Sequence, residues 1–238
     1  MIDFDKFKSN LNDLVIECES DSERGDRNEA QTRFDIIDKV LFDCLDWSRE
    51  ETKVERSFDG KYTDYELGRK KLAVVEAKKE GLSFKIPSGT IKNNKIKLST
   101  LFSLEKSNIK EAVIQAKDYC SERGIQYGIV TNGHQYICFL ASRTDGVPIK
   151  EGIAIAFISL RDILENFELA WESMSKHGLE DSSTNQLFRK ANIALPKKLS
   201  SKLIDYPKFR YKNDLQSNLA IVTALQKSYD LDEYHKTI

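Results

Sequence analysis

A short stretch of the sequence, Val74-Val75-Glu76-Ala77-Lys78, puts an acid and a base two residues apart at the end of an apolar run. Residues i and i+2 of a strand share a face, so Glu76 and Lys78 are expected to project together while Ala77 points away. A carboxylate beside an ammonium group can bind a divalent cation and position or deprotonate a water molecule. The same spacing is common in surface ion pairs, so this stretch alone leaves both interpretations open.

The preceding strand adds a second acid. In the segment 61–67, Asp64 shares a face with Tyr62 and Glu66. If the two strands pair antiparallel through the polar turn at 68–71, Asp64 lies beside Glu76 near the end of the sheet. Two carboxylates and a backbone carbonyl that converge suit a hard cation such as Mg²⁺. The alternative is that Asp64 belongs to a solvated edge strand.

A helix predicted from about Asn28 to Leu45 contributes a third acid. Asn28 is a suitable N-cap, which puts Glu29 in the first helical turn. The apolar stripe of this helix is expected to contain Ala30, Phe34, Ile37, Leu41 and Leu45. If the helix packs on the sheet, Glu29 joins the other two carboxylates. An acid at a helix N-terminus is also favoured by the helix dipole alone.

A second predicted helix, over residues 109–122, ends at Gly124, a residue suited to the position after a helix. Along it, Gln115 and Tyr119 are four residues apart and so lie on one stripe. That stripe could contact a phosphate of a substrate, or it could be an ordinary solvated face.

The elements that must position these residues alternate between helix and strand. Two hairpins are predicted, one at Asp59-Gly60 and one at Asn132-Gly133, because both dipeptides suit tight turns. A further apolar strand is expected at 152–160. This order predicts an α/β fold with a mixed central sheet flanked by helices. We expect one domain over residues 1–160 and a C-terminal helical extension over 161–238.

Composition narrows the class of protein. The chain has 238 residues and a formal net charge of -1, so its overall charge does not indicate a nucleic-acid partner. No apolar run approaches the roughly 18 to 20 residues of a membrane span, and the first residues lack a signal-peptide core. The four cysteines are far apart and form no metal motif, which predicts reduced core residues in a cytoplasmic protein.

Three stretches carry a resemblance to a known family: NEAQTRFDIIDKVLFDCLDW, YTDYELGRKKLAVVEAKKEG and QAKDYCSERGIQYGIVTNGHQYICFL. Together they resemble the N-terminal nuclease domain of type I restriction enzyme R subunits, which belongs to the PD-(D/E)xK restriction-endonuclease-like superfamily. The resemblance covers roughly residues 27–142. It implies a restriction-endonuclease-like fold and a metal-dependent endonuclease acting on DNA in a restriction or anti-phage defence system.

Carried over position by position, the resemblance assigns roles to single residues. Asp64 and Glu76 match the metal-binding acids, and Lys78 matches the catalytic lysine. Glu29 matches the acid of the helical motif, and the Ala77 carbonyl matches the backbone metal ligand. The residues Gln115 and Tyr119 match the Gln-x-x-x-Tyr element near the substrate. The implied cofactor is Mg²⁺, with Mn²⁺ able to substitute.

The sequence departs from the family between Lys78 and Gln115. Residues from about 82 to 108 look like an insertion, which we interpret as a candidate flap over the site. Its lysines, with Lys92, Lys95 and Lys97 as the main candidates, are expected to contact nucleic acid. The alternative is that they belong to a solvated connector. In addition, Thr63 stands where the superfamily's name has a proline.

The leading hypothesis is therefore a Mg²⁺-dependent DNA endonuclease. The alternatives are a DNA-binding or assembly module of the same fold that does not cut, and a nuclease that acts on RNA. No Walker A sequence occurs, so the motor of a type I enzyme is absent from this chain. We expect a homo-oligomer, partner subunits or domains of a defence complex, and a chain that is a fragment of a longer protein.

Overall fold

The computed structural model describes residues 4–21, 27–58, 61–79, 84–87, 89–91, 93–104 and 107–188. The chain divides into two compact units, Met1–Arg189 and Lys190–Ile238. The second unit, with the last part of the predicted helical extension, lies outside the described residues.

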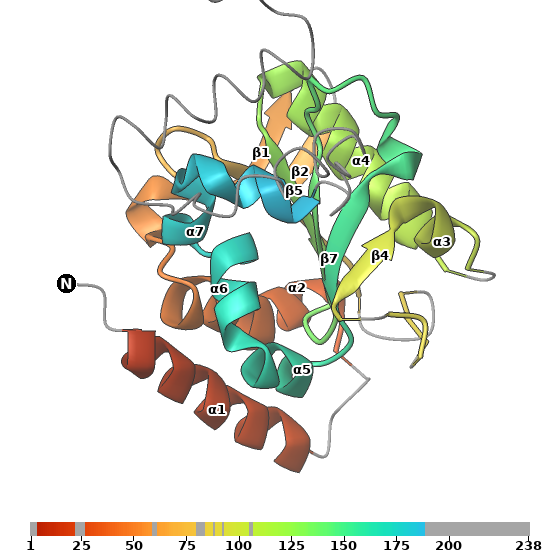
Figure 1. Ribbon diagram of the computed structural model, residues 1–238. Coiled ribbons are helices and arrows are strands. Elements are labelled where there is room, and N and C mark those ends of the chain that lie inside the picture. Colours follow the sequence, from red (N-terminus) through yellow and green to blue (C-terminus); the bar gives the residue numbers. More distant parts are fainter. Residues whose placement is uncertain are drawn as a thin grey trace, which may run out of the picture. The chain divides into compact units, whose positions relative to one another are not determined.

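The described strands of the first unit form one mixed sheet (Figure 1). In spatial order they are β1 (Lys53–Phe58), β2 (Lys61–Leu67), β3 (Ala73–Ala77), β5 (Tyr127–Thr131), β6 (Tyr136–Leu140), β7 (Ile153–Phe157) and β4 (Lys95–Lys97). The pair β3–β5 is parallel and every other neighbouring pair is antiparallel. The sheet and its flanking helices confirm the predicted α/β class.

Helices cover both faces of this sheet (Figure 1). One face carries α1 (Phe4–Ser20), a long helix described below, α5 (Leu160–Glu165), α6 (Phe167–Met174), α7 (Lys176–Glu180) and the 3₁₀ segment η5 (Ser182–Phe188). The other face carries α3 (Leu98–Phe102) and α4 (Ile109–Arg123), and two short 3₁₀ turns are η3 (Arg49–Glu51) and η4 (Ile149–Glu151). Because both faces are covered, every residue of β3, β5 and β6 is buried.

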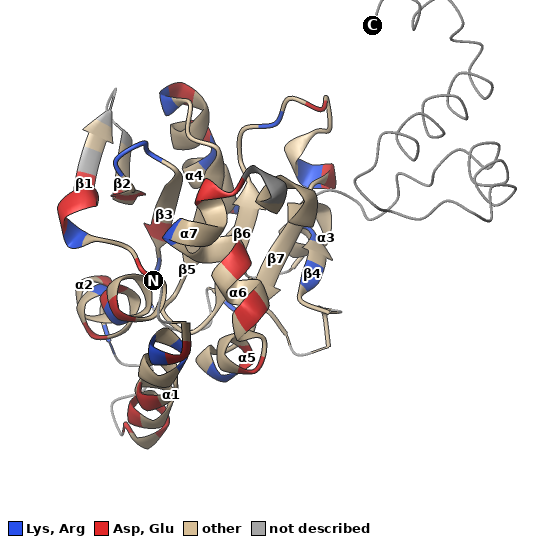
Figure 2. Cartoon of the chain, turned by 60° about the vertical axis from the view of Figure 1, so that its left-hand side comes forward, with Lys and Arg blue, Asp and Glu red and all other residues tan. Residues whose placement is uncertain are grey.

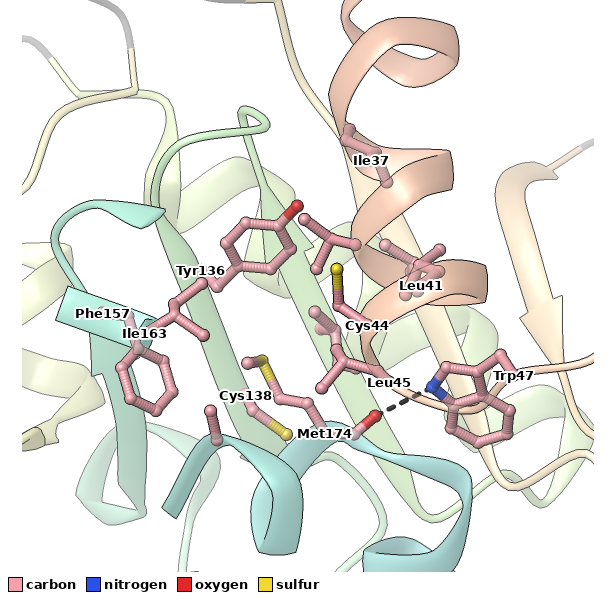
Figure 3. Packing of buried hydrophobic residues seen from close by; sticks show 14 of the residues in the cluster. Ile37, Leu41, Cys44, Leu45, Trp47, Tyr136, Cys138, Phe157, Ile163 and Met174 are labelled. Carbon is pink, nitrogen blue, oxygen red and sulfur yellow. Dashed lines mark hydrogen bonds between the residues drawn. The ribbon is translucent and has the colours of Figure 1, made fainter. Parts of the chain in front are cut away.

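The two sides of β3 belong to two separate hydrophobic clusters. Val75 and Ala77 join the cluster under α1 and α6, whereas Val74 joins the cluster under α4. Figure 3 shows part of the first cluster, in which the indole N–H of Trp47 donates to the Met174 carbonyl at 2.9 Å. This alternation is the one predicted for a strand, so Glu76 lies on the same side as Val74.

The hairpins and helix ends follow the local sequence signals. The register of β1 and β2 brings Phe58 opposite Lys61, as a tight turn at 59–60 requires, although that turn lies outside the described residues. The loop between β5 and β6 holds Gly133 at φ +86°, and α4 ends at Gly124 with φ +66°. Both glycines therefore adopt the left-handed conformation that other residues avoid.

The long helix over residues 29–44 is wound differently from the expectation. It begins as α2 (Glu29–Thr32) and continues as two π-helical segments, η1 (Arg33–Ile37) and η2 (Lys39–Cys44). The wider winding appears in the hydrogen bond from the Asp38 N–H to the Arg33 carbonyl, five residues back. As a result, the predicted stripe position Phe34 is wrong: its side chain is 73% exposed, while Ile36 is buried.

The first compact unit extends beyond the predicted domain boundary. Helices α5, α6 and α7, which the sequence predicts as part of the extension after residue 160, join the same hydrophobic cluster through Ile163, Met174 and Leu179, respectively. The apolar faces of these helices cover one side of the sheet, so the boundary lies after residue 189 instead. No helix among the described residues is long and apolar enough to cross a membrane. All four cysteines are free and buried, as predicted.

The described part of the expected insertion does not form a flap. The strand β4 pairs with β7 at the far edge of the sheet, and α3 follows it directly. Phe84 and Ile86 are buried in the cluster under α4. The apolar residues of this segment therefore extend the sheet and its core instead of covering the acidic residues.

Candidate active site

The pairing of β2 with β3 brings the two predicted acids together. Tyr65 pairs with Val75 and Glu66 with Val74, so the same antiparallel register sets Asp64 opposite Glu76. Oδ2 of Asp64 accepts a hydrogen bond from the Ala77 N–H at 2.7 Å. Asp64 thus lies beside Glu76, as the sequence predicted, and its carboxylate is also anchored to the main chain at the end of β3.

The acid and base of the Glu-x-Lys stretch form a close ion pair. The Lys78 ammonium lies 2.6 Å from Oε1 of Glu76. The main chain of Lys78 is held to β5, since its N–H donates to the Thr131 carbonyl at 2.8 Å. The Glu76 side chain is 4% exposed and that of Lys78 is 27% exposed, so the acid is the inner partner and the base the outer one.

A cleft of about 410 Å³ opens at this end of the sheet. Figure 2 shows β1, β2 and β3 side by side with α2 near their ends. The residues that line the cleft come from α2, η1, β1, β2, α4 and the end of β3: Glu29, Arg33, Glu55, Tyr62, Thr63, Asp64, Glu76, Lys78 and Gln115. Five of the predicted site residues therefore share one cavity.

Glu29 reaches the cleft because of its helix cap. The Asn28 side chain accepts a hydrogen bond from the Gln31 N–H at 2.8 Å, which confirms Asn28 as the N-cap. The next residue, Glu29, begins the helix and lines the cleft. Its charge is one of the influences on the pKa of Glu76, so the third acid is within electrostatic reach of the second.

The structure adds two residues that the sequence did not suggest. Nη1 of Arg33 donates to Oδ1 of Asp64 at 3.2 Å and to Oε1 of Glu55 at 3.1 Å. Its guanidinium also lies over the ring of Tyr65, 5.1 Å from the centroid. Arg33 is one helical turn after Glu29, and that spacing could have identified it.

Glu55 has no comparable sequence signal. Its backbone has φ +51°, a left-handed conformation that is costly for a residue with a side chain. Strained backbone of this kind is concentrated at functional sites. The pairing of β1 with β2 sets Glu55 across from Asp64, a relationship that only the strand register can create.

Burial gives both inner acids a raised pKa. For Glu76, burial raises the pKa to about 7; Lys78 opposes the increase, and the charges of Asp64 and Glu29 add to it. For Asp64, burial again raises the pKa, against the lowering effects of the Ala77 N–H and of Arg33. Ionising these buried carboxyl groups therefore costs free energy, and a nearby cation would lower that cost.

The predicted pair on α4 separates in the structure. Gln115 is exposed and lines the cleft. Tyr119 is 1% exposed, and its hydroxyl lies 3.5 Å from Oε2 of Glu66, which also accepts from Arg123 at 3.3 Å. Because a buried ring cannot touch a nucleic-acid strand, the direct contact predicted for Tyr119 does not fit this arrangement.

The predicted lysines lie far from the acids. Lys95 and Lys97 are exposed on β4, four strand spacings or about 19 Å from β3. Lys97 is 3.6 Å from Glu151. Short edge strands with lysines are a usual protection against edge-to-edge pairing, and β4 fits that role. Lys92 lies outside the described residues.

The donor chemistry of the cleft suits a hard cation. Carboxylate and carbonyl oxygens are the ligands that Mg²⁺ takes, and Asp64 and Glu76 supply carboxylates to the cleft. Among the described residues, no group of three or more His, Cys, Asp or Glu is arranged to hold a metal ion. Arg33 and Lys78 instead occupy one oxygen of each inner acid. The donor types therefore suit a divalent cation, while both oxygens of Asp64 and one of Glu76 are engaged by protein groups.

Comparison of the chain with protein-family models, with curated proteins and with solved structures finds no match. The class that the geometry defines is an α/β protein with an open cleft whose inner acids, Asp64 and Glu76, lie beside a lysine. A function for this cleft therefore has to be argued from its own residues.

Proposed function

We propose that this chain is the nuclease module of a restriction or anti-phage defence protein, with a restriction-endonuclease-like fold, and that it hydrolyses phosphodiester bonds of DNA. One observation carries the proposal: Glu29, Asp64, Glu76 and Lys78 come from three separate segments and line the same cleft. A surface ion pair would need only the last two. The order of these residues along the chain agrees with the PD-(D/E)xK resemblance.

In this proposal the acids form the cation site. Asp64, Glu76 and the Ala77 carbonyl hold Mg²⁺ or Mn²⁺, and Glu29 adds negative charge to the same site. When bound, the ion supplies Lewis-acid polarisation of the phosphate and a lowered pKa for water. The anchoring of Asp64 by the Ala77 N–H fixes two of the three ligands relative to each other before any cation arrives.

Lys78 and Gln115 contact the substrate in this proposal. Because Lys78 is the outer partner of its ion pair, its ammonium is the group that an incoming phosphate meets first. It neutralises charge on the phosphate and orients the attacking water by hydrogen bonding. The exposed amide of Gln115 can donate to an oxygen of the same phosphate or its neighbour.

A second candidate function is a module of the same fold that binds DNA without cutting it. The contact between Arg33 and Asp64 favours this candidate, because it keeps a cation-binding oxygen engaged. A nuclease that acts on RNA shares the chemistry, and a side-by-side digestion of DNA and RNA separates the two. Proposed partners besides DNA are a second copy of the chain and other subunits of a defence complex.

The test compares plasmid cleavage by the wild-type chain and variants in Mg²⁺ or Mn²⁺. Asp64→Asn and Lys78→Met should each slow cleavage roughly 100-fold or more. Lys95→Ala is the control, because it removes an exposed lysine on the far edge of the sheet. If wild type and both cleft variants behave alike, the active-site assignment is wrong. Salt-dependent binding of an uncut plasmid identifies the non-cleaving module.

A further inference from the structure

A second hollow adjoins the cleft, and its lining combines aromatic rings and two arginines with two acids, Asp38 and Glu55. It has a volume of about 280 Å³ and lies between η1, η2 and β1. Arg33 and Glu55 line both this hollow and the cleft. These two side chains form an ion pair at 3.1 Å, so the two cavities share a wall.

Two guanidinium groups in this hollow lie over aromatic rings. Arg33 covers Tyr65 with its Cζ 5.1 Å from the ring centroid, and Arg49 covers Phe42 at 4.2 Å. The rings and acid partners hold the guanidinium groups in position: Arg49 pairs with Asp38 at 3.3 Å, and Arg33 pairs with Glu55 and Asp64. The Arg49 side chain is 63% exposed. Planar cationic surfaces of this kind stack with planar, electron-rich ligands.

The third aromatic residue is open to solvent. Phe34 lines the hollow and is 73% exposed, because the π-helical winding of η1 turns it away from the core. Val54, on the opposite wall, is 51% exposed. Exposed apolar side chains that meet at a hollow indicate a binding site more than a packing defect.

We infer that this hollow binds one unstacked nucleobase of the strand whose phosphate enters the cleft, with the base against Phe34 and the guanidinium of Arg49. The inference rests on the proposed function and adds the part of the substrate that it leaves unassigned. A volume of about 280 Å³ is at the low end of small-molecule sites and suits one base better than a base pair.

Arg33 contacts groups of both cavities. Its Nη1 is 3.2 Å from Oδ1 of Asp64, and its Cζ is 5.1 Å from the centre of the Tyr65 ring. One guanidinium group thus spans the cation site and the floor of the hollow. Aromatic and arginine faces bind bases without reading their identity, so the hollow should tolerate all four bases.

The test measures binding of oligonucleotides that contain a single 2-aminopurine, moved to each position in turn, in EDTA so that the strand stays intact. Phe34→Ala and Arg49→Ala should each weaken binding about tenfold and reduce the fluorescence change at one position. The matched controls are Ile16→Ala, an exposed apolar position on α1, and Arg161→Ala, an exposed arginine on α5. Both controls should bind within about twofold of wild type.

Affinities of Phe34→Ala and Arg49→Ala within about twofold of wild type would overturn the inference. The inference would also be overturned if Phe34→Ala bound DNA as tightly as wild type but shifted toward monomer in sedimentation. The hollow would then be an interface between copies of the chain. Failure of the proposed function looks different, because cleavage would then not depend on Asp64. Binding that depends on Phe34 without such cleavage would support the base site alone.

Discussion

The Lys78 ammonium lies 2.6 Å from Oε1 of Glu76, yet burial still raises the pKa of that carboxyl to about 7. A single neighbouring cation therefore does not offset the loss of hydration at this position. The charge of Asp64 across the strand pair and that of Glu29 on α2 act in the same direction as burial. The cleft therefore favours the binding of a further positive charge. Without one, the ionised Glu76 carboxyl lowers the stability of the fold.

Glu76→Gln should stabilise the protein at high pH when no divalent cation is present. The folded state holds the Glu76 proton up to about pH 7, against an ordinary pKa of 4.5, so the carboxyl destabilises the fold increasingly between these values and fully above 7. At 1.36 kcal/mol per pH unit the gain has an upper limit of about 3 kcal/mol. In this variant Lys78 loses its ion-pair partner, but its side chain is partly exposed and can turn to solvent, so no unpaired charge is left buried.

Urea unfolding in EDTA at pH 4.5 and pH 8 measures this effect. The gain should be present at pH 8 and nearly absent at pH 4.5. Glu168→Gln, at an exposed position on α6, is the matched control. A gain of equal size at both pH values would contradict the raised pKa of Glu76. Added Mn²⁺ should stabilise wild type more than Glu76→Gln.

Arg33→Met should tighten binding of a divalent cation. The substitution removes a positive charge from Oδ1 of Asp64 and keeps an apolar stem over Tyr65. A charge removed at this distance is worth at least about 1 kcal/mol, the value for screening as strong as in bulk water, so Kd should fall roughly fivefold or more. Calorimetric titration with Mn²⁺ measures it, with Arg49→Met as the control. Weaker binding by Arg33→Met would mean that Arg33 supports the site instead of competing for it.

Asn28→Ala should lower the free energy of unfolding by about 1 kcal/mol, because it removes the cap of the helix that begins with Glu29. Asn28→Ser retains a capping oxygen and should stay within a few tenths of wild type. Denaturant unfolding of the three proteins gives both values. Equal losses in the two variants would show that the cap contributes nothing.

The variants Gln115→Ala and Tyr119→Phe test whether each residue contacts the substrate or supports the fold. Gln115 lines the cleft, so its truncation should slow cleavage several-fold with little change in stability. Tyr119→Phe removes a long contact to Glu66, which keeps its partner Arg123, so both the cleavage rate and the affinity for DNA should stay near wild type. Cleavage rates and urea unfolding of both variants check this. A large cleavage defect in Tyr119→Phe alone would reverse the two roles.

Much of the fold could be predicted because its signals are local. Asn28 caps the helix that follows it, Gly124 ends α4, and the dipeptide Asn132-Gly133 lies in the loop between β5 and β6. These effects depend on the backbone preferences of one or two residues, which the sequence contains directly. The pairing of Asp64 with Glu76 was predictable for the same reason, since a short turn fixes the register.

Tertiary structure alone decided the rest. Gln115 and Tyr119 share a helical stripe, but only one meets the cleft, because α4 runs across the sheet and buries its next turn over Glu66. The π-helical winding that exposes Phe34 has no period visible in the sequence. The contact of Arg33 with Asp64 joins residues 31 positions apart. The sequence by itself determined the candidate residues and the local turns that present them, because these depend on neighbouring positions. Long-range packing determined which candidates meet in one cavity and added Arg33 and Glu55 to them.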